Sequence, residues 1–333
     1  MDTNNTNNNN TNNNNTTDQK HQRRVRYKGT HPKSFKDKYK ELQPEKYTDT
    51  VEKVIKKGST PAGMHISICV KEILEFFAIK PDQVGFDATL GYGGHTLEML
   101  KSLGGTGHVH ATDVDPIEIV KTTDRLEKLG FGPERLTAHN RSFSEIDKVV
   151  AAAAPFDFIL ADLGVSSMQI DNPDRGFSYK HDGPLDLRLN PERGISAAER
   201  LKGIDRNELE GMFIENADEP HAALIARAIV ASQKRGKYIE TTSDLRNLIA
   251  KTLTPAPVKA TEDEIKKTCQ RCFQALRIDV NDEFEVLYEF LEKLPAALNS
   301  GGKVAILTFH SGEDRLVKKS FQKFLKEIGR AHV

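Results

Sequence analysis

The sequence predicts an α/β fold, a parallel sheet covered by helices, with a separate helical domain inserted into it. Three observations predict this arrangement. Between residues 62 and 167, apolar segments of strand length alternate with amphipathic stretches, which is the pattern of a parallel sheet covered by helices. Between 168 and 270 the alternation stops, and helical runs and turn-rich pieces replace it. Residues 271–333 then return to a helix followed by a buried strand.

Each element of the predicted sheet layer has a local signal. Apolar residues at the helical spacing i, i+3, i+4, i+7 predict an amphipathic helix over 67–78, at Val70, Ile73, Leu74 and Phe77. Short apolar runs predict strands at 84–88, 107–112, 136–139 and 156–161, and helices are expected at 95–103 and 116–129. Near the end, an apolar helix face at 284–294 precedes a buried strand at 303–309.

The first 61 residues differ from the rest of the chain. Residues 1–19 form an Asn- and Thr-rich tail with almost nothing apolar to bury, which predicts disorder. Residues 20–61 form a basic extension, with thirteen Lys and Arg against five Asp and Glu over 20–57 and four aromatic rings between them. Two interpretations remain open: an arm that follows nucleic-acid phosphates and stacks its rings, and a solvated, partly helical extension.

Composition argues against several classes of protein. Lys and Arg together equal Asp and Glu at 48 each, so net charge alone does not indicate a nucleic-acid partner. No apolar run approaches the roughly 18–20 residues that span a bilayer, so no membrane is expected. Three cysteines indicate a reducing compartment. Cys269 and Cys272 lack the second ligand pair of a structural zinc site, so we interpret them as helix-face thiols and expect no metal.

The most informative motif lies between the first two predicted strands. Residues 87–95 read Asp-Ala-Thr-Leu-Gly-Tyr-Gly-Gly-His, and Asp113 ends the next strand. Glycines between a strand and a helix let the backbone approach a ligand, and an acid at the end of the next strand suits a ribose diol. The glycine spacing differs from the dinucleotide fingerprint, and Asp87 would repel a pyrophosphate. We therefore predict S-adenosylmethionine, whose amino acid end is cationic, and disfavour an NAD-dependent dehydrogenase.

A second carboxylate follows the strand at 156–161. Asp162 and the pair Ser166 and Ser167 come after the carboxyl end of that strand, where ligands bind in open α/β sheets. We expect them to face the same crevice as Gly93 and to accept a proton from an attacking amine. The alternative is that Asp162 only caps the following turn.

Several further motifs keep one order along residues 62–320. They are 87–95, 113–116, 162–167, Gln169 with Asp171, 175–178, 182–188, 273–281 and 309–315. In this order the chain resembles the bacterial-type small-subunit ribosomal RNA cytosine-N4 methyltransferases, the MraW/RsmH type.

The resemblance implies a class I S-adenosylmethionine methyltransferase with a Rossmann-like parallel sheet and an inserted helical domain. The methyltransferase domain would comprise residues 62–167 and 271–333, with the insert at 168–270. The implied cofactor is S-adenosyl-L-methionine, the substrate a cytidine amine, and the partner small-subunit ribosomal RNA or the small ribosomal subunit. Implied cofactor contacts, carried over by motif, are Gly93, Gly94, His95, Asp113, Phe143, Asp162 and Gln169, with the ring of Phe143 lying on adenine.

The catalytic candidates are Asp162, Ser166, Ser167 and His310. His310 follows the last strand and is either a positioning or proton-relay group or an ordinary histidine in a turn. Three arginines, Arg175, Arg188 and Arg277, either hold phosphates or order turns through ion pairs. We expect a structural role for Arg277, because the residues around it are apolar.

Some questions stay open at this level. Members of the family normally continue beyond the final helix to one more basic strand, so we expect an edge strand of the sheet to be missing. A methyltransferase of a protein or small molecule, and an RNA-binding or ribosome-assembly factor without catalysis, remain alternatives. Retention of Asp113, Asp162 and the glycine turn favours catalysis. The sequence decides neither between a cytoplasmic and an organellar location nor the oligomeric state.

Overall fold

The sheet of this protein, in a computed structural model that describes residues 67–331, has five parallel strands in the order β3-β2-β1-β4-β5. The strands are β1 (Val84–Asp87), β2 (His108–Asp113), β3 (Leu136–Asn140), β4 (Phe156–Asp162) and β5 (Leu298–Leu307). Because parallel strands end at the same edge, Asp87, Asp113 and Asp162 lie along one edge of the sheet. The predicted α/β class is confirmed. The tail and the basic extension lie outside the described residues.

Alternating side chains of the strands supply two apolar cores, one on each face of the sheet. Phe158 and Leu160 of β4 point to one face, whereas Phe156 and Ile159 point to the other. The first face is covered by α3 (Val70–Phe77), α4 (Gly94–Ser102) and α5 (Pro116–Lys128), and the second by α6 (Ile146–Ala153), α13 (Glu283–Ala297) and part of α14 (Ser311–Ala331).

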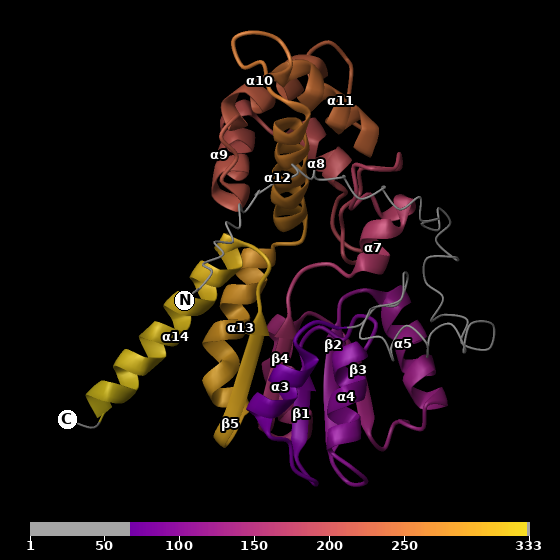
Figure 1. Ribbon diagram of the computed structural model, residues 1–333, viewed down its shortest axis with the longest axis vertical. Helices are drawn as coiled ribbons and strands as arrows, with labels where there is room; N and C mark the ends of the chain where they lie inside the picture. The colour runs from indigo at the N-terminus through magenta and orange to yellow at the C-terminus, as the bar shows by residue number, and fades with distance from the viewer. Residues whose placement is uncertain (1–66, 332–333) are drawn as a thin grey trace, which may run out of the picture.

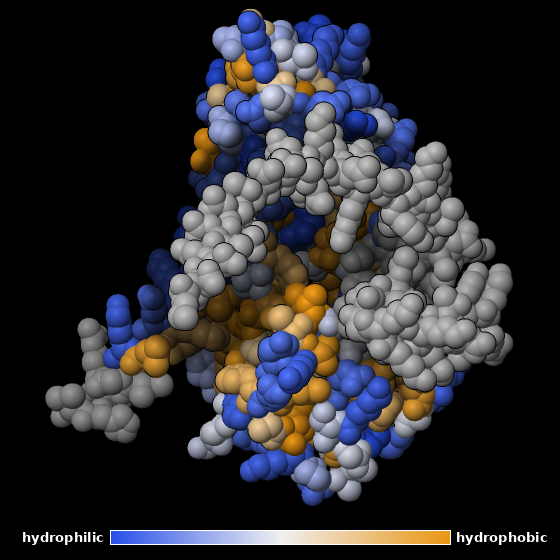
Figure 2. All heavy atoms as spheres, viewed as in Figure 1, coloured by the Kyte–Doolittle hydropathy of each residue, from blue (hydrophilic) through white to orange (hydrophobic). Residues whose placement is uncertain are grey.

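A helical layer lies beyond the carboxyl edge of the sheet (Figure 1). It contains α8 (Ala197–Gly203), α9 (Arg206–Ala217), α10 (Ala222–Gln233), α11 (Thr242–Leu253) and α12 (Glu262–Val280). These helices share a third apolar core with buried leucines, isoleucines and both Cys269 and Cys272. Figure 2 shows mostly hydrophilic residues over this layer and hydrophobic residues nearer the middle of the molecule. The expected insert is therefore helical, and its expected end at residue 270 falls inside α12.

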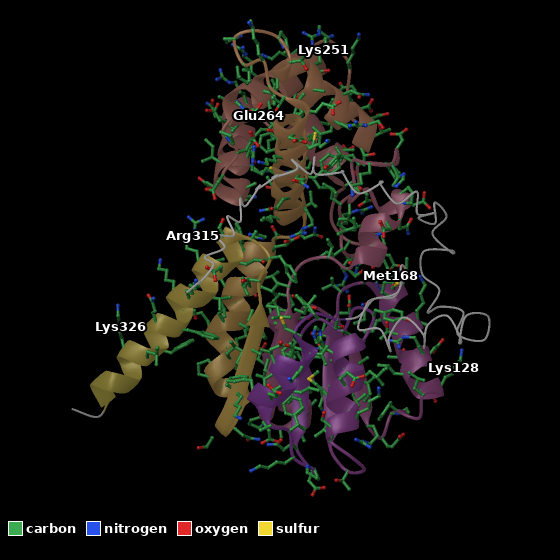
Figure 3. The ribbon with its side chains drawn as sticks, in the orientation of Figure 1. Lys128, Met168, Lys251, Glu264, Arg315 and Lys326 are labelled. Carbon is green, nitrogen blue, oxygen red and sulfur yellow. The ribbon has the colours of Figure 1, made fainter. Side chains whose placement is uncertain are left out.

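The segment between the two layers is short and irregular. It contains α7 (Ser167–Asp171), on which Met168 lies between the layers (Figure 3), and the one-turn helix η3 (Pro173–Arg175). A second short turn, η2 (Phe143–Glu145), connects β3 to α6. These connections bring the ends of β3 and β4 toward the helical layer.

Strand β5 lies at the edge of the sheet, and α14 follows it and projects away from the body (Figure 1). The strand begins at Leu298, five residues before the expected start, and its register against β4 shifts between Phe156 and Phe158. The other four strands, and the helices α3, α4, α5 and α13, match the predicted ranges to within a few residues, whereas no range was predicted for α6 or α14. No helix between residues 67 and 331 has both the length and the apolar character needed to cross a bilayer.

Candidate active site

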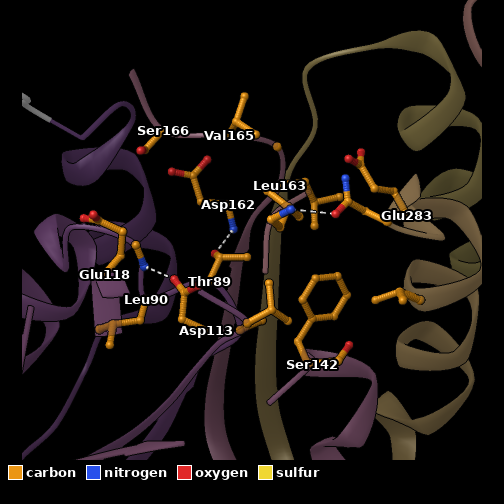
Figure 4. Close-up of a pocket in the computed structure, with 18 of the residues that line it drawn as sticks. Thr89, Leu90, Asp113, Glu118, Ser142, Asp162, Leu163, Val165, Ser166 and Glu283 are labelled. Atoms are coloured by element: carbon orange, nitrogen blue, oxygen red, sulfur yellow. Dashed lines mark hydrogen bonds between the residues drawn. The ribbon is translucent and has the colours of Figure 1, made fainter. Parts of the chain in front are cut away.

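A cavity of about 720 Å³ lies at the carboxyl edge of the sheet, between the two layers. Its floor is made by the turns after β1, β2 and β4, and Leu189, Asn190 and Arg193 contribute from the helical side. Figure 4 shows the Asp162 carboxylate in this space, with Asp113 and Ser142 on the sheet side and Glu283 on the opposite wall. The volume is that of a site for a ligand of nucleoside size.

The glycine turn forms part of the cavity wall, and its glycines are required by packing. Gly93 has φ of +73°, and a Cβ there would lie 2.8 Å from Thr122 Cγ2 of α5. A Cβ on Gly94 would lie 2.2 Å from Ser67 Oγ. The positive φ and the contact with α5 disfavour a side chain at Gly93, whereas one at Gly94 would require the Ser67 hydroxyl to move. Both residues line the cavity, as the sequence predicted for cofactor contacts.

Asp113 lies at the end of β2 with both carboxylate oxygens held by backbone groups. Oδ2 accepts a hydrogen bond from the N–H of Gly91 at 2.7 Å, and Oδ1 accepts one from the N–H of Asp115 at 2.8 Å. Burial raises the pKa of Asp113 to about 6, against these hydrogen bonds, which lower it. The carboxylate thereby fixes the turn after β1 and presents its remaining lone pairs to the cavity.

The side chain of Asp87 is buried at the end of β1, whereas the sequence led us to expect it beside the cofactor. Its side chain is 1% exposed and does not line the cavity. Instead it accepts hydrogen bonds from Thr96 Oγ1 at 2.5 Å and from the N–H of Thr89 at 3.0 Å. The structure thus gives Asp87 a role in holding the turn after β1 and the start of α4, and its expected contact with the cationic end of a cofactor stays a prediction.

His95 and Asp162 lie against each other at the bottom of the cavity. His95, 7% exposed, places Nδ1 3.4 Å from Asp162 Oδ2 and Nε2 2.8 Å from the carbonyl oxygen of Ile68. The backbone N–H of Asp162 donates to Thr89 Oγ1 at 2.7 Å, which fixes the end of β4 (Figure 4). Both residues line the cavity.

The second carboxylate oxygen of Asp162, Oδ1, differs from Oδ2 in its contacts. Asp162 Oδ1 is buried and has no hydrogen-bond partner among residues 67–331. A buried acceptor without a partner costs about 1–3 kcal/mol, and such groups concentrate at functional sites. Burial raises the pKa of Asp162 to about 6; His95 lowers it, whereas Asp87 and Glu313 raise it further. A carboxylate in this state is suited to accept a proton near neutral pH.

Ser166 and Gln169 are joined in the cap of α7. Ser166 Oγ accepts from the N–H of Gln169 at 3.2 Å, and Gln169 Oε1 accepts from the N–H of Ser166 at 3.0 Å. This is a capping box, which stabilises the start of a helix. Ser166 and Gln169 line the cavity, but their side chains already have partners inside the protein. Ser167 begins α7 beside them.

Arg175 and Asp115 link the glycine-turn side of the site to the segment before the helical layer. Arg175 Nη1 lies 2.6 Å from Asp115 Oδ2, and the two side chains are 11% and 0% exposed. Asp115 also caps α5, and Gln169 Nε2 donates to it at 3.3 Å. Arg175 Nη2 donates to the carbonyls of Arg188 and Leu189. Ion pairing is thus the observed role of Arg175, and Arg188 likewise pairs with Asp186.

Phe143 lies in the short turn after β3 and lines the cavity. Its ring packs edge-on against Phe290 of α13, with 5.1 Å between centroids and an interplanar angle of 73°. One face of the wall is therefore aromatic and rigid. The predicted contact of this ring with adenine stays a prediction.

His310 lies beside the cavity, between Phe309 and Glu313, which line it. Its Nε2 is 3.2 Å from Glu313 Oε1. Burial disfavours the charge of Glu313, but the neighbouring His310 and a hydrogen bond from the N–H of Phe309 hold its pKa below the ordinary value. His310 thus contacts the cavity wall through Glu313, and its predicted catalytic role remains a prediction.

Glu283, His310 and Glu313 each place one potential ligand atom within 4.8 Å of the others. Arg277 already supplies a positive charge there, because its guanidinium donates to both oxygens of Glu283 at 2.8 Å. This ion pair agrees with the structural role expected for Arg277. An acidic cluster alone does not establish a metal site, so the expectation of none also stays a prediction.

The sequence did not single out several residues of the cavity wall. Phe309 is 58% exposed although it lines the cavity, and Gly164 beside it has φ of +95°. Thr89 and Asn281 act by holding backbone: Asn281 bonds Leu187 and Leu189 of the helical side. The exposure of Phe309 depends on tertiary structure, so only its place in the motif 309–315 could have indicated it.

Cys269 and Cys272 are buried on the inner face of α12. Burial raises the pKa of Cys269 to about 11 and that of Cys272 well above its ordinary value. The interpretation as helix-face thiols is confirmed. They stay protonated and belong to the core of the helical layer.

Comparisons with known proteins agree with this geometry. The model of the MraW methylase family matches residues 62–330. The chain is 70% identical over 302 residues to ribosomal RNA small subunit methyltransferase H 1 of Lachnoclostridium phytofermentans, covering 91% of this chain and 82% of that one. It is 67% identical to ribosomal RNA small subunit methyltransferase H 2 of Alkaliphilus metalliredigens, covering 93% of this chain and 89% of that one.

Proposed function

The chain belongs to the MraW methylase family, and from this premise we propose that it methylates the N4 amine of a cytidine in small-subunit ribosomal RNA. It is a methyltransferase whose cofactor is S-adenosylmethionine. The observation that carries the proposal is the carboxylate of Asp162 in the wall of a cavity of nucleoside size, with its Oδ1 unpartnered within residues 67–331. A methylase of an amine needs an acceptor at this place, because the amine must lose a proton.

The residues of the cavity fit the cofactor. Asp113 offers carboxylate lone pairs to ribose hydroxyls, Phe143 offers an aromatic wall to adenine, and Gly93 leaves the backbone accessible. When bound, S-adenosylmethionine supplies an electrophilic methyl group on a sulfonium. Among the wall residues, Asp113 and Asp162 supply negative charge toward that cation. The predicted cofactor residues therefore remain our assignment for binding.

The chemical task of the protein is to orient the amine and remove its proton. The lone pair of an aromatic amine is delocalised into the ring, so attack on the methyl group requires a fixed direction. The carboxylate of Asp162 is the acceptor we assign for the N4 proton, since it lines the cavity at the end of β4 and its Oδ1 is unpartnered within residues 67–331. Ser166 Oγ already accepts the N–H of Gln169 in the cap of α7, so we assign Ser166 to orientation of the amine. Ser167 and His310 remain catalytic candidates, and we assign neither of them a contact with the substrate.

Phe309 is the surface we assign to the target base. An enzyme that acts on a base takes it out of the stack and holds it against aromatic or apolar side chains. Phe309 is held at its backbone by Glu313, which accepts its N–H at 2.8 Å, while 58% of its surface is open. A Cβ at Gly164 would lie 3.8 Å from the ring. The ring is thus accessible in the wall of the cavity that Asp162 also lines.

One experiment tests the proposed function. Purified protein is incubated with S-adenosylmethionine carrying a labelled methyl group and with small ribosomal subunits or their RNA, and the modified nucleotide is mapped. We expect label on N4 of one cytidine. Label on protein, or on a different atom of the RNA, would contradict the substrate. Measurable cofactor binding without transfer to any of these acceptors would favour an assembly factor that has lost catalysis.

A further inference from the structure

A three-residue segment, 187–189, leads from the core of the helical layer to the wall of the cavity, and its backbone is fully bonded. Leu187 is buried with φ of +64°, a strained conformation for a leucine that persists only where its surroundings hold it. Asn281 Nδ2 donates to the carbonyl of Leu187 at 2.8 Å, and Asn281 Oδ1 accepts from the N–H of Leu189 at 2.7 Å. Arg175 Nη2 donates to the carbonyls of the last two residues, and the two remaining N–H groups also have acceptors. The segment is therefore a rigid support for the chain that follows it.

A tight turn follows this segment and carries Arg193 into the wall of the cavity. The carbonyl of Asn190 accepts the N–H of Arg193 at 3.2 Å, and Asn190 Oδ1 accepts the N–H two residues later at 2.9 Å. Asn at the first position and Pro191 at the second are typical of such a turn. Beyond the turn, Arg188 Nη1 donates to the carbonyl of Gly194 at 3.2 Å. The backbone of Arg193 is thus held on both sides.

The guanidinium of Arg193 has no partner among the described residues, unlike those of the two arginines that hold its loop. Arg175 pairs with Asp115. Arg188 pairs with Asp186. Arg193 is exposed, and its side chain makes no hydrogen bond or ion pair with any described residue. Its charge is therefore available to a ligand at the cavity.

The charge of the cavity wall decides which part of an RNA can enter. Seven carboxylates and two arginines line the cavity. Three of the carboxylates pair with a lysine or arginine outside the wall, so the remaining four still outnumber the two arginines. Such a wall favours a cationic cofactor and admits an uncharged base, but it repels a phosphate. The phosphate of a nucleotide whose base enters must therefore stay at the mouth of the cavity.

The two arginines of the wall differ in their position. Arg141 follows β3 on the sheet side, and its Nε is buried. Arg193 is exposed on the helical side. The guanidinium of Arg193 is therefore the one that a phosphate outside the cavity can reach.

From this arrangement we infer that the guanidinium of Arg193 binds the phosphate of the nucleotide whose base enters the cavity. The inference rests on the proposed function and adds the contact that holds the RNA backbone. A guanidinium presents parallel N–H donors that fit the oxygens of a phosphate. Arg175 and Asn281 serve as positioning residues, because they hold the backbone segment that supports the turn of Arg193.

The cofactor contains a carboxylate, which is the other anion that a guanidinium can bind. Gly93 and Asp113, which we assign to the cofactor, belong to the sheet side of the cavity, whereas Arg193 belongs to the helical side. We therefore choose the RNA phosphate, and we measure the binding of both ligands.

Three substitutions separate the charge of Arg193 from its surroundings. Arg193→Gln removes the charge, and Arg193→Lys keeps the charge without the fork of donors. The matched control is Arg227→Gln, because Arg227 is likewise exposed and without a side-chain partner among the described residues, but does not line the cavity. It lies on α10, at the end of the helical layer away from the sheet (Figure 1). Both positions are exposed, so we expect unchanged melting temperatures in all three variants.

The measurement is the Kd of the RNA that carries the mapped cytidine, over a range of KCl concentrations, together with the Kd of S-adenosylmethionine. Each phosphate that a protein neutralises on a single strand releases counterions and contributes a slope of about −0.7 to log affinity against log salt. We expect Arg193→Gln to raise the RNA Kd about 10-fold and to make the slope shallower by about 0.7. Arg193→Lys should keep the wild-type slope, and Arg227→Gln should match wild type in both quantities.

Two results would overturn the inference. The first is a salt slope in Arg193→Gln equal to that of wild type. The second is a weaker Kd of S-adenosylmethionine with unchanged RNA binding, which would assign Arg193 to the carboxylate of the cofactor.

A second measurement changes the RNA instead of the protein. The phosphate on either side of the target cytidine is replaced, one at a time, by a neutral methylphosphonate. We expect one replacement to weaken binding to wild type about 10-fold and to leave binding to Arg193→Gln unchanged. Equal losses in the two proteins at both positions would contradict the inference while wild-type methyl transfer persists. A wild-type protein that transfers no methyl group to RNA would instead refute the proposed function, so the two failures are distinguishable.

Discussion

In the helical layer two partly exposed arginines are paired with neighbouring carboxylates, whereas the sheet layer presents a buried carboxylate oxygen that has no partner within the described residues. Arg200 contacts Asp279 at 2.8 Å, and Arg271 contacts the fully buried Glu219 at 2.6 Å. At the sheet edge, Asp162 Oδ1 has no partner within residues 67–331. The paired groups of the helical layer serve its own packing. We therefore assign the chemistry to the sheet edge, and the helical layer contributes to the wall of the space above it.

The largest effect is expected at the unpartnered carboxylate. Asp162→Asn keeps the shape of the side chain but removes its ability to accept a proton. We expect kcat for methyl transfer to fall about 10³-fold, within the range of general base catalysis, with an unchanged melting temperature. Initial rates at saturating RNA and cofactor check this. The control is Asp124→Asn, at an exposed site of α5, which should keep full activity. Full activity of Asp162→Asn would show that Asp162 does not accept the proton, and the sheet layer would then have no assigned base.

The next effect tests the pairing at the junction of the layers. Arg175→Met leaves the carboxylate of Asp115 buried without its ion-pair partner, and breaking a buried pair in this way costs about 3–5 kcal/mol. We expect the free energy of unfolding to drop by that order in urea titrations. Arg188→Met is the matched control: its pair with Asp186 is more exposed, so the loss should be about 1 kcal/mol or less. Equal losses of unfolding free energy in the two variants would show that the ion pair of Arg175 and Asp115 stabilises the protein no more than the pair of Arg188 and Asp186.

The sheet layer could be predicted from sequence because its signals are local. Strand β1 follows from three apolar or small residues before Asp87, and the glycines and Asp113 then follow from the order of strand, turn and helix. Parallel strands place their ends at one edge, which brings Asp113 and Asp162 to one cavity. Strand β5 was predicted late, since its first residues include Gly301 and Gly302 and pair with β4 across a register shift.

The partners of the polar groups could not be predicted in this way. Asp87 is covered by Thr96 because α4 packs over the end of β1, and His95 reaches Asp162 because the backbone of Ile68 holds its other nitrogen. Ser166 forms a capping box with Gln169, three residues later; the sequence contains this signal, although we considered only a catalytic role for Ser166, which stays a prediction. Such roles depend on which acceptor lies nearest, and this is a property of tertiary structure.

The smallest expected effect concerns the face that the sheet layer offers to the target base. Phe309→Leu removes the ring but keeps an apolar side chain beside Gly164. Stacking of a base on an aromatic ring contributes about 1–3 kcal/mol, so we expect the KM for RNA to rise about 10-fold while the Kd of S-adenosylmethionine stays unchanged.

Phe309→Tyr, which keeps the ring, should retain wild-type KM. Phe76→Leu is the control, because Phe76 is 51% exposed on α3 and does not line the cavity. If Phe309→Leu and Phe309→Tyr both bind RNA as the wild type does, the target base lies elsewhere, and the helical side of the cavity, with Arg193 and Asn190, must hold it. That outcome would reverse the comparison, since the helical layer would then bind the target base directly.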